Sequence, residues 1–564
     1  MKKILAFTLL LAMTLSMLIG CGDNTSGNNA SNGQNNGTSD SGTTVSAPKE
    51  IRVGRSYDAT TLDPHNGNDD GSYNIIKYLS EGLVRDKNGV IVPGVAESWE
   101  INEDGTEIVF HLRKDAKWND GTALTAEDFR YSFLRLLDPN VGYNYSGSAY
   151  IFKNAEKYFN GECTADEVGV EVIDEYTLKI IRESSSIETL YELSATAFLP
   201  IRRDIAEQHG VTYGSEADKI MTNGPFTLTE WSHESQMILV KNENYWDKDS
   251  INLDKITMVM GASGETAVDM MLAGQLDLIQ TGDQNHVDTL TGSGFTAEPF
   301  ASGYQCIHMN SAGRNEETAK FMSNSNFRRA LNLTINRDAI IAAALKGCQA
   351  TTRISAPTDM GVNDTMHNEY PYQGWPTNGD AAEAKKYFDL AMKELGTTAA
   401  DVPELSMLCF DSEGTMTILQ AAQDMLLNNL GIQCTIDPQP IQQMIGKAIS
   451  GDWDFWYGGM TRGTMDWLST GSVADGFDSD PAKDEYGTYN YCNEDFNALY
   501  RKAVVTMDVK ERKDLLFEME KILCEDPATI MVGWNRAYIV CNADLTGLLI
   551  SGGDADFTYM DLAQ

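Results

Sequence analysis

The sequence predicts an exported α/β protein with two or three lobes. Its 564 residues are more than one compact hydrophobic core usually accommodates. The first twenty residues have the charge and apolar pattern of an export signal. In the second half of the chain, strand patterns alternate with amphipathic helix patterns, as they do in α/β lobes.

The N-terminus predicts a signal peptide over residues 1–20. Two lysines are followed by an uncharged apolar stretch, residues 4–19, which is short for a membrane span. Residues 18–21 read Leu-Ile-Gly-Cys and resemble a bacterial lipobox, in which Cys21 receives a diacylglyceryl group and becomes the mature N-terminus. The alternative is an ordinary signal with a chance cysteine. The small residue, the cysteine and their distance from the apolar stretch together favour lipidation.

Residues 21–49 are expected to form a flexible tether behind the lipid. Gly, Asn, Ser and Thr dominate this segment, and Val45 is its only large aliphatic residue. Such a composition buries too little apolar surface to become ordered. A flexible chain of this length typically spans roughly 30 Å. No later apolar run is long enough to cross a membrane, so we expect the remainder to be soluble.

The charge of the chain argues against nucleic acid as a partner. Its formal net charge is −39, and a field of that sign repels phosphate backbones. It also does not hold the protein on an anionic membrane. The simplest interpretation of the negative charge is a solvated acidic surface. Attraction of cationic ligands is a second, less favoured interpretation.

Recognisable catalytic and metal-binding motifs are missing from the sequence. The nine cysteines form no Cys-x-x-Cys pair, and no two of the seven histidines have metal-ligand spacing. Neither a nucleophile elbow nor a phosphate-binding loop occurs. We therefore expect no enzyme activity, no cofactor and no metal, and we expect most of the cysteines to be small buried residues.

In the first half of the chain, strands and short helices alternate. Residues 73–84 are expected to form a short helix, and residues 106–112 alternate like a half-buried strand. A second helix is expected to begin after Thr125, a suitable N-cap with Asp128 three residues later, and to stop at the next proline. Residues 167–181 are expected to form two strands joined by a turn.

The second half has the clearest strand–helix–strand series. Before the midpoint of the chain, residues 226–240 are expected to form a hairpin. In the second half, residues 380–395 are expected to form a strongly amphipathic helix that a glycine ends. The next elements are a strand at 405–410, a helix at 418–430 that also ends at a glycine, and a strand at 432–436. This order of elements is typical of an α/β lobe.

An aromatic and glycine-rich segment begins at Trp453. Its first part, with Trp453 and Phe455, is interpreted as a buried strand. Glycines and aromatic residues follow in the next twelve positions. Glycines allow a backbone to approach a ligand closely, and aromatic rings offer stacking area. This second part is therefore a candidate binding wall.

The folded part resembles the extracellular oligopeptide- and dipeptide-binding proteins of ABC importers, bacterial solute-binding protein family 5, along essentially its whole length. The matching blocks occur in the order typical of that family. They are Glu-Gly-Leu-Val at 81–84, Pro-Gly-Val-Ala-Glu-Ser-Trp at 93–99, Phe-His-Leu-Arg-Lys-Asp-Ala-Lys-Trp-Asn-Asp-Gly at 110–121, Thr-Ala-Glu-Asp-Phe at 125–129, Thr-Asn-Gly-Pro-Phe at 222–226, Lys-Asn-Glu-Asn-Tyr-Trp at 241–246, Phe-Arg-Arg-Ala-Leu at 327–331, Ile-Asn-Arg-Asp at 335–338 and Tyr-Cys-Asn-Glu-Asp-Phe at 491–496.

The resemblance implies a two-lobed periplasmic-binding-protein fold of type II, cluster C, with an extra domain inserted in lobe one. Residues 50–81, 205–305 and 530–564 would then build lobe I. Residues 82–204 would form the inserted subdomain, and residues 306–529 would form lobe II.

The resemblance also implies the partners and the place of action. A short peptide would bind in the cleft between the lobes, and the closed protein would deliver it to ABC permease subunits with cytoplasmic ATPases. The protein would act as a monomer on the outer face of the cytoplasmic membrane, held there by the lipid on Cys21, in a bacterium that we expect to be Gram-positive. Closure would need only a few backbone torsions to change at the two chain crossings.

One loop departs from the family pattern. Peptide binders typically place an aspartate after an Asp-x-Asp strand, here Asp452 and Asp454, to pair with the peptide's α-amino group. No acid lies at the aligned positions, 460–463. Asp466 is a candidate replacement, and a helix cap is an equally good interpretation of it. Arg462 in the same loop is a candidate for binding a carboxylate or another anion.

The resemblance and the departing loop together give a set of candidate cleft-lining residues. They are Thr281, Tyr304, His308, Gly459, Met460, Arg462, Asp466 and Trp467. Thr281 lies in a segment that resembles the family's lobe-one cleft wall, and Tyr304 and His308 lie on the strand that would enter lobe II. The rival functions are a secreted hydrolase, whose nucleophile motifs are missing, a peptide-pheromone receptor that does not import, and a binder of a sugar, a nickel chelate or a cell-wall fragment with the same fold.

Overall fold

The structure is a computed structural model in which residues 48–564 form one compact unit. The predicted signal peptide, Cys21 and the tether lie outside the described residues. The described residues are 48–563, except positions 68, 88–89, 144–145, 184–187, 358, 360, 462–476, 478, 481–484, 488, 507 and 552–553. No helix of the described part is long and apolar enough to span a membrane.

An 11-stranded mixed sheet connects the two ends of this unit. Its strand order is β15-β14-β16-β12-β19-β11-β1-β10-β9-β8, and β13 pairs with β19 off this path. The bounds are β1 Glu50–Gly54, β8 Phe226–Ser232, β9 Gln236–Lys241, β10 Lys255–Val259, β11 Leu278–Thr281, β12 Thr296–Met309, β13 Gln349–Ala350, β14 Leu405–Phe410, β15 Cys434–Gln439, β16 Phe455–Thr461 and β19 Thr529–Cys541.

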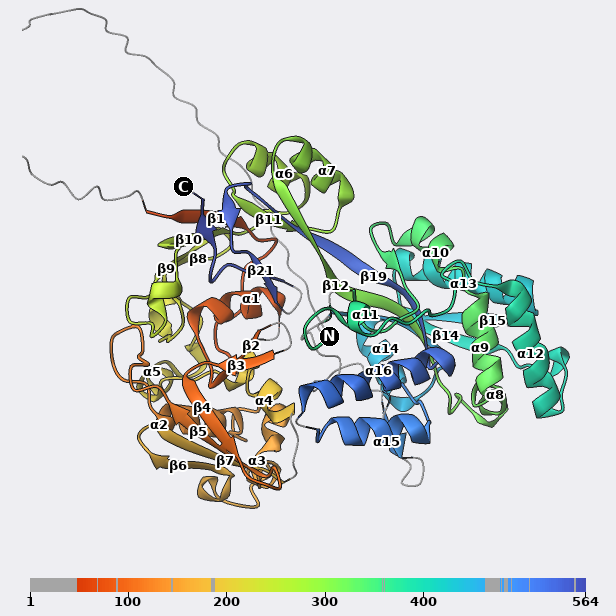
Figure 1. Ribbon diagram of the computed structural model, residues 1–564, viewed down its shortest axis with the longest axis horizontal. Helices are drawn as coiled ribbons and strands as arrows, with labels where there is room; N and C mark the ends of the chain where they lie inside the picture. The colour runs from red at the N-terminus through yellow and green to blue at the C-terminus, as the bar shows by residue number, and fades with distance from the viewer. Residues whose placement is uncertain are drawn as a thin grey trace, which may run out of the picture. The chain divides into compact units, whose positions relative to one another are not determined.

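The two long strands at the centre of the sheet carry the chain from one half to the other. β12 and β19 lie side by side and antiparallel, with Tyr304 opposite Trp534 (Figure 1). Their register shifts between Ala301 and Gly303 and again between Gln305 and Cys306. Such irregularities bend a strand locally. The expected boundaries between the lobes, 305/306 and 529/530, fall within these two strands.

Three parts of the chain have hydrophobic cores of their own. One core lies between α1 and the strands β1, β8, β9 and β10. A second is built only from residues between Leu83 and Phe198. A third lies between β14, β15, β16 and helices α9, α12 and α13. The helices on the first and third parts are α1 Asp70–Leu79, α5 Arg203–His209, α6 Gly264–Leu272, α7 Gln284–Gly292, α8 Glu316–Met322, α9 Ser325–Thr334, α10 Arg337–Ala344, α11 Met366–Glu369, α12 Ala381–Leu395, α13 Glu413–Leu430, α14 Ile441–Ser450, α15 Glu494–Ala503 and α16 Val509–Glu525.

The second core has a four-stranded antiparallel sheet in the order β4-β5-β7-β6. Its burial follows the sequence pattern, because every second residue of β5 points inward, as the alternation at 106–112 predicts. The elements of this part are β2 Val84–Lys87, β3 Val90–Pro93, β4 Ala96–Ile101, β5 Glu107–Leu112, β6 Val170–Asp174, β7 Thr177–Ile181, α2 Ala126–Leu136, α3 Ala155–Phe159 and α4 Glu188–Glu192.

The hairpin expected at 226–240 and most elements expected in the second half are confirmed. The hairpin is β8–β9, the amphipathic helix is α12, and the strand–helix–strand series is β14, α13 and β15. Gly396 and Gly431 end α12 and α13 in the left-handed conformation, at φ 61° and 74°. Trp453 and Phe455 are fully buried, as the interpretation of this segment as a buried strand predicts.

The bounds expected for the first helix, residues 73 and 84, were both wrong. α1 begins at Asp70, because the side chain of Asp69 accepts a hydrogen bond from the backbone N–H of Ser72 at 2.9 Å. It ends at Leu79, and Val84 instead begins β2 opposite Pro93. Pairing with a distant strand therefore overrides the local helical pattern.

Replacing Asp128 by Ala is expected to lower the free energy of unfolding by about 1–2 kcal/mol. The Asp128 carboxylate accepts hydrogen bonds from the backbone N–H of Thr125 at 2.8 Å and from its hydroxyl at 3.0 Å, at the start of α2. Urea unfolding followed by circular dichroism measures the loss. Glu127→Ala is the matched control, because Glu127 is exposed in the same turn and its loss should cost under about 0.5 kcal/mol. Equal losses in the two variants would contradict the capping role.

Candidate functional site

A cavity of about 1530 Å³ lies beside the two crossing strands. The first part of the sheet contributes residues 54–57 and 280–282 to its wall, and the crossing strand β19 contributes residues 535–537. The turn after α10 contributes residues 344–348, and the part built around β4–β7 contributes residues 194–199 among others. Segments far apart in the sequence therefore share one wall. The volume exceeds the roughly 300–1,000 Å³ of sites for drug-sized ligands.

A polar network lies where the crossing strands meet the cavity. The side-chain oxygen of Asn535 accepts hydrogen bonds from the amide of Gln305 at 3.1 Å and from the thiol of Cys348 at 3.2 Å. The Tyr457 hydroxyl donates to the other end of the Gln305 side chain at 2.6 Å. Burial raises the pKa of the Cys348 thiol, which keeps it a neutral donor. The network links β12, β16, β19 and the turn after α10.

A second cluster lies on the wall around the Glu81 segment. Glu81 is 5% exposed and accepts hydrogen bonds from the Tyr245 hydroxyl and, at 2.7 Å, from the Trp246 indole N–H. The Arg85 guanidinium lies 3.5 Å from the same carboxylate, and the Arg113 guanidinium stacks 3.7 Å from the centre of the Trp246 ring. Burial raises the pKa of Glu81, although the two arginines and the hydrogen bonds oppose this rise.

Thr281 lies on the cavity wall, at the end of β11. Its hydroxyl is 3.0 Å from the Nδ1 atom of His286 and accepts a hydrogen bond from the backbone N–H of Asp283 at 3.1 Å. These contacts fix the side chain at the first turn of α7. Of the eight candidate residues, Thr281 is the one that the structure places among the described residues of the cavity wall.

Tyr304 and His308 lie in the interior of β12. Tyr304 is 2% exposed and meets Trp534 edge to face, with ring centres 5.4 Å apart. His308 is 1% exposed and stacks on Tyr489 at 3.9 Å. Burial lowers the pKa of His308 to about 3, so its ring is neutral at physiological pH. Neither residue is among the described residues of the cavity wall.

The remaining candidates lie in and after β16. The backbone of Gly459 pairs with Gln305, and that of Met460 pairs with Tyr304. Arg462, Asp466 and Trp467 lie outside the described residues. The amine anchor at Asp466 and the anion site at Arg462 therefore stay predictions.

The cavity wall contains charged residues that sequence reasoning did not select. Lys346 and Arg536 are the clearest, because they come from the turn after α10 and from β19. Arg113 was noted only as part of a family motif with a structural role. In the linear sequence no signal distinguishes these cations from others, since the wall forms only when distant segments meet.

Among the described residues, no group of three or more His, Cys, Asp or Glu side chains is arranged to hold a metal ion. The eight described cysteines are all free thiols. Five of them are buried: Cys306, Cys409, Cys434, Cys524 and Cys541. The expectation of small buried cysteines is thus confirmed for these five, and Cys492 is exposed.

The α/β architecture and the large cavity beside two crossing strands define a two-lobed solute-binding protein. Residues 90–488 match the model of the bacterial extracellular solute-binding proteins, family 5. The chain belongs to this family. The family consists of substrate-binding transport proteins and not of enzymes.

Similar proteins span almost the whole chain. The oligopeptide-binding protein OppA of Bacillus subtilis is 29% identical over 97% of this chain and 96% of its own length. The periplasmic oligopeptide-binding protein OppA of Escherichia coli is 26% identical over 91% of each chain. The substrate-binding domain of an oligopeptide ABC transporter from Bacillus anthracis has a TM-score of 0.64 at 25% identity, with 92% of this chain and 99% of that chain covered. These findings confirm the expected two-lobed fold and family.

Proposed function

We propose that the protein is the lipid-anchored substrate-binding component of an ABC importer, and that it captures short peptides between its lobes and delivers them to a membrane permease. The observation that carries the proposal is the cavity of about 1530 Å³, whose wall joins the first part of the sheet, the crossing strand β19 and the turn after α10. The names of the relatives, oligopeptide- and dipeptide-binding proteins, supply the ligand class.

The division into lobes is part of this proposal. Lobe I comprises residues 50–81, 205–305 and 530–564, the inserted subdomain residues 82–204, and lobe II residues 306–529. The separate hydrophobic cores support this division, because all the buried members of one of them lie within residues 83–198. Parts with independent cores can move against one another as rigid bodies.

Ligand capture would work by a shift between open and closed arrangements of the lobes. A peptide that contacts both walls binds the closed arrangement better and shifts the equilibrium by that difference in affinity. The register irregularities of β12 near Ser302 lie on the cavity wall, where a few torsions would suffice for closure. Strand-like hydrogen bonds to the peptide backbone would give affinity without strict sequence preference.

The lipid on Cys21 and the tether of residues 21–49 would hold the protein at the outer face of the cytoplasmic membrane of a Gram-positive bacterium. There, as a monomer, it would meet the permease and its cytoplasmic ATPases. A peptide-pheromone receptor is the alternative function, and the chain resembles the pheromone receptor PrgZ in fold with a TM-score of 0.64 at 22% identity.

Native mass spectrometry of the chain from Pro48 onward tests the peptide ligand. We expect peptide-sized adducts that leave on unfolding, and a higher melting temperature when short peptides are added back to the refolded protein. N-acetylated peptides should stabilise less if an acid such as Asp466 pairs with the free amine. The absence of both adducts and stabilisation across a mixed peptide library would contradict peptides as the ligand class.

A further inference from the structure

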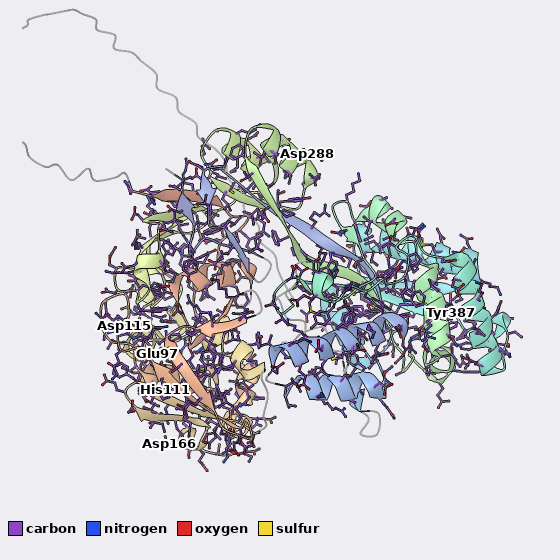
Figure 2. The ribbon with its side chains drawn as sticks, viewed as in Figure 1. Glu97, His111, Asp115, Asp166, Asp288 and Tyr387 are labelled. Carbon is purple, nitrogen blue, oxygen red and sulfur yellow. The ribbon has the colours of Figure 1, made fainter. Side chains whose placement is uncertain are left out.

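The cavity wall has the opposite charge balance to the rest of the protein. In the whole chain, 82 acidic residues face 43 basic ones. Among the described residues of the cavity wall, Arg and Lys outnumber Asp and Glu by seven to four. Exposed acids such as Asp115, Asp166 and Asp288 lie instead on the outer surface (Figure 2). The cavity wall thus carries an excess of positive charge within a strongly acidic protein.

The acids of the wall are engaged by neighbouring groups. The Glu81 carboxylate is buried, accepts hydrogen bonds from Tyr245 and Trp246, and lies beside Arg85. Asp556 accepts a hydrogen bond from the backbone N–H of Thr558 at 2.9 Å. Asp86 and Glu192 also have interaction partners. Of these four acids, Glu81 is the one whose charge is opposed by a described cation, because the Arg85 guanidinium lies 3.5 Å from its carboxylate.

Several cations of the wall are held by neutral groups. The Arg536 guanidinium donates to the side-chain oxygen of Gln349 at 3.0 Å and to the Tyr538 hydroxyl at 3.5 Å. The Lys87 ammonium lies 5.8 Å from the centre of the Tyr559 ring. Lys346 is exposed and has no ion pair with a described residue. Neutral partners position a cation without cancelling its charge.

Two of these cations share one end of the cavity. Lys346 precedes Gly347, where an added Cβ would lie 3.2 Å from the carbonyl oxygen of Gly282. A Cβ on Gly282 would in turn lie 3.7 Å from the carbonyl oxygen of Arg536. The turn after α10, the end of β11 and strand β19 therefore meet closely. Low-dielectric walls focus the field of such paired charges into the cleft.

We propose that the cavity selects acidic peptides, with Lys346 and Arg536 as specificity-determining residues that attract a ligand carboxylate at the crossing-strand end. Lys87 and the two arginines beside the Glu81 carboxylate, Arg85 and Arg113, provide further positive charge on the wall. This inference rests on the proposed function, since it names the class of peptide.

Isothermal titration of the purified protein with three pentapeptides of equal length tests it. The peptides carry two Glu, two Gln or two Lys residues in otherwise identical sequences. Affinity should fall in the order Glu, Gln, Lys, with a difference of about tenfold or more between the extremes. The difference should shrink at high salt, because ions screen the attraction.

Variants locate the effect. The neutral double variant Lys346→Gln with Arg536→Gln should bring the three affinities together, and Lys346→Glu with Arg536→Glu should reverse their order. The control is Lys385→Glu with Lys393→Glu on α12, outside the cavity wall. It changes the net charge as much as the double Glu variant of the cavity does, and it should leave the wild-type order of the three affinities unchanged. Correct folding of each variant is checked by its melting temperature.

Two results would overturn the inference in distinguishable ways. If the peptides bind and the Lys peptide binds as tightly as the Glu peptide, or if the α12 control shifts the order as much as the cavity variant, the charge selection is wrong and the proposed function stands. If none of the three peptides binds, the proposed peptide-binding function fails, and the inference fails with it.

Discussion

Replacement of Glu520 by Ala is expected to lower the free energy of unfolding by about 3–5 kcal/mol. Glu520 lies on α16, is fully buried, and accepts hydrogen bonds from the Arg353 guanidinium at 2.6 Å and from the hydroxyl of Ser355 at 2.7 Å. It also accepts one from the backbone N–H of Ser355 at 2.8 Å. Removing the carboxylate leaves Arg353 buried with its charge unpaired, together with unsatisfied donors on Ser355.

The measurement is urea unfolding of the wild type and the variant under identical conditions. Glu518→Ala is the matched control on the same helix, because Glu518 is exposed and pairs with Lys521 at 2.9 Å in solvent. Exposed pairs contribute at most about 1 kcal/mol, so the control should be nearly neutral. If the two variants lost the same stability, the buried network would not have the assigned role.

Local chemistry explains why many elements could be predicted from sequence. The N-cap Asp380 and the C-terminal Gly396 bound the amphipathic helix α12, and both signals are contained in the residues themselves. The alternation of β5 predicts its buried face for the same reason. Val84 was placed wrongly because its strand depends on pairing with Pro93. That pairing is a tertiary contact, and local pattern does not encode it.

The site could be predicted less well, because its wall is assembled from distant segments. Tyr304 and His308 were selected for their place on a strand between the lobes. Which face of that strand is covered depends on partners such as Tyr489, almost two hundred positions later. Lys346 and Arg536 line the same cavity for a similar non-local reason, because their segments come together only in the folded protein. The composition of the chain even suggests the opposite charge for the cavity, because acidic residues outnumber basic ones in the whole sequence but not on the cavity wall.

Acidification is expected to destabilise the wild type more than the variant His308→Phe. Burial lowers the folded-state pKa of His308 to about 3, whereas a histidine in an unfolded chain titrates near 6.5. Between these values the unfolded chain binds a proton that the folded protein does not. The stability due to neutral His308 is therefore complete above pH 6.5 and falls by about 1.4 kcal/mol for each pH unit below it, or about 2 kcal/mol at pH 5.

The groups that face His308 do not offset this loss. Tyr489, Trp456 and Phe477 are neutral rings around it, and burial raises the pKa of the neighbouring Cys306 thiol to about 12. A Phe at this position keeps a ring against Tyr489 and cannot bind a proton. Urea unfolding at pH 7 and pH 5 should thus show a loss about 2 kcal/mol larger for the wild type than for His308→Phe. Parallel pH profiles for the wild type and His308→Phe would mean that His308 accepts a proton in the folded protein.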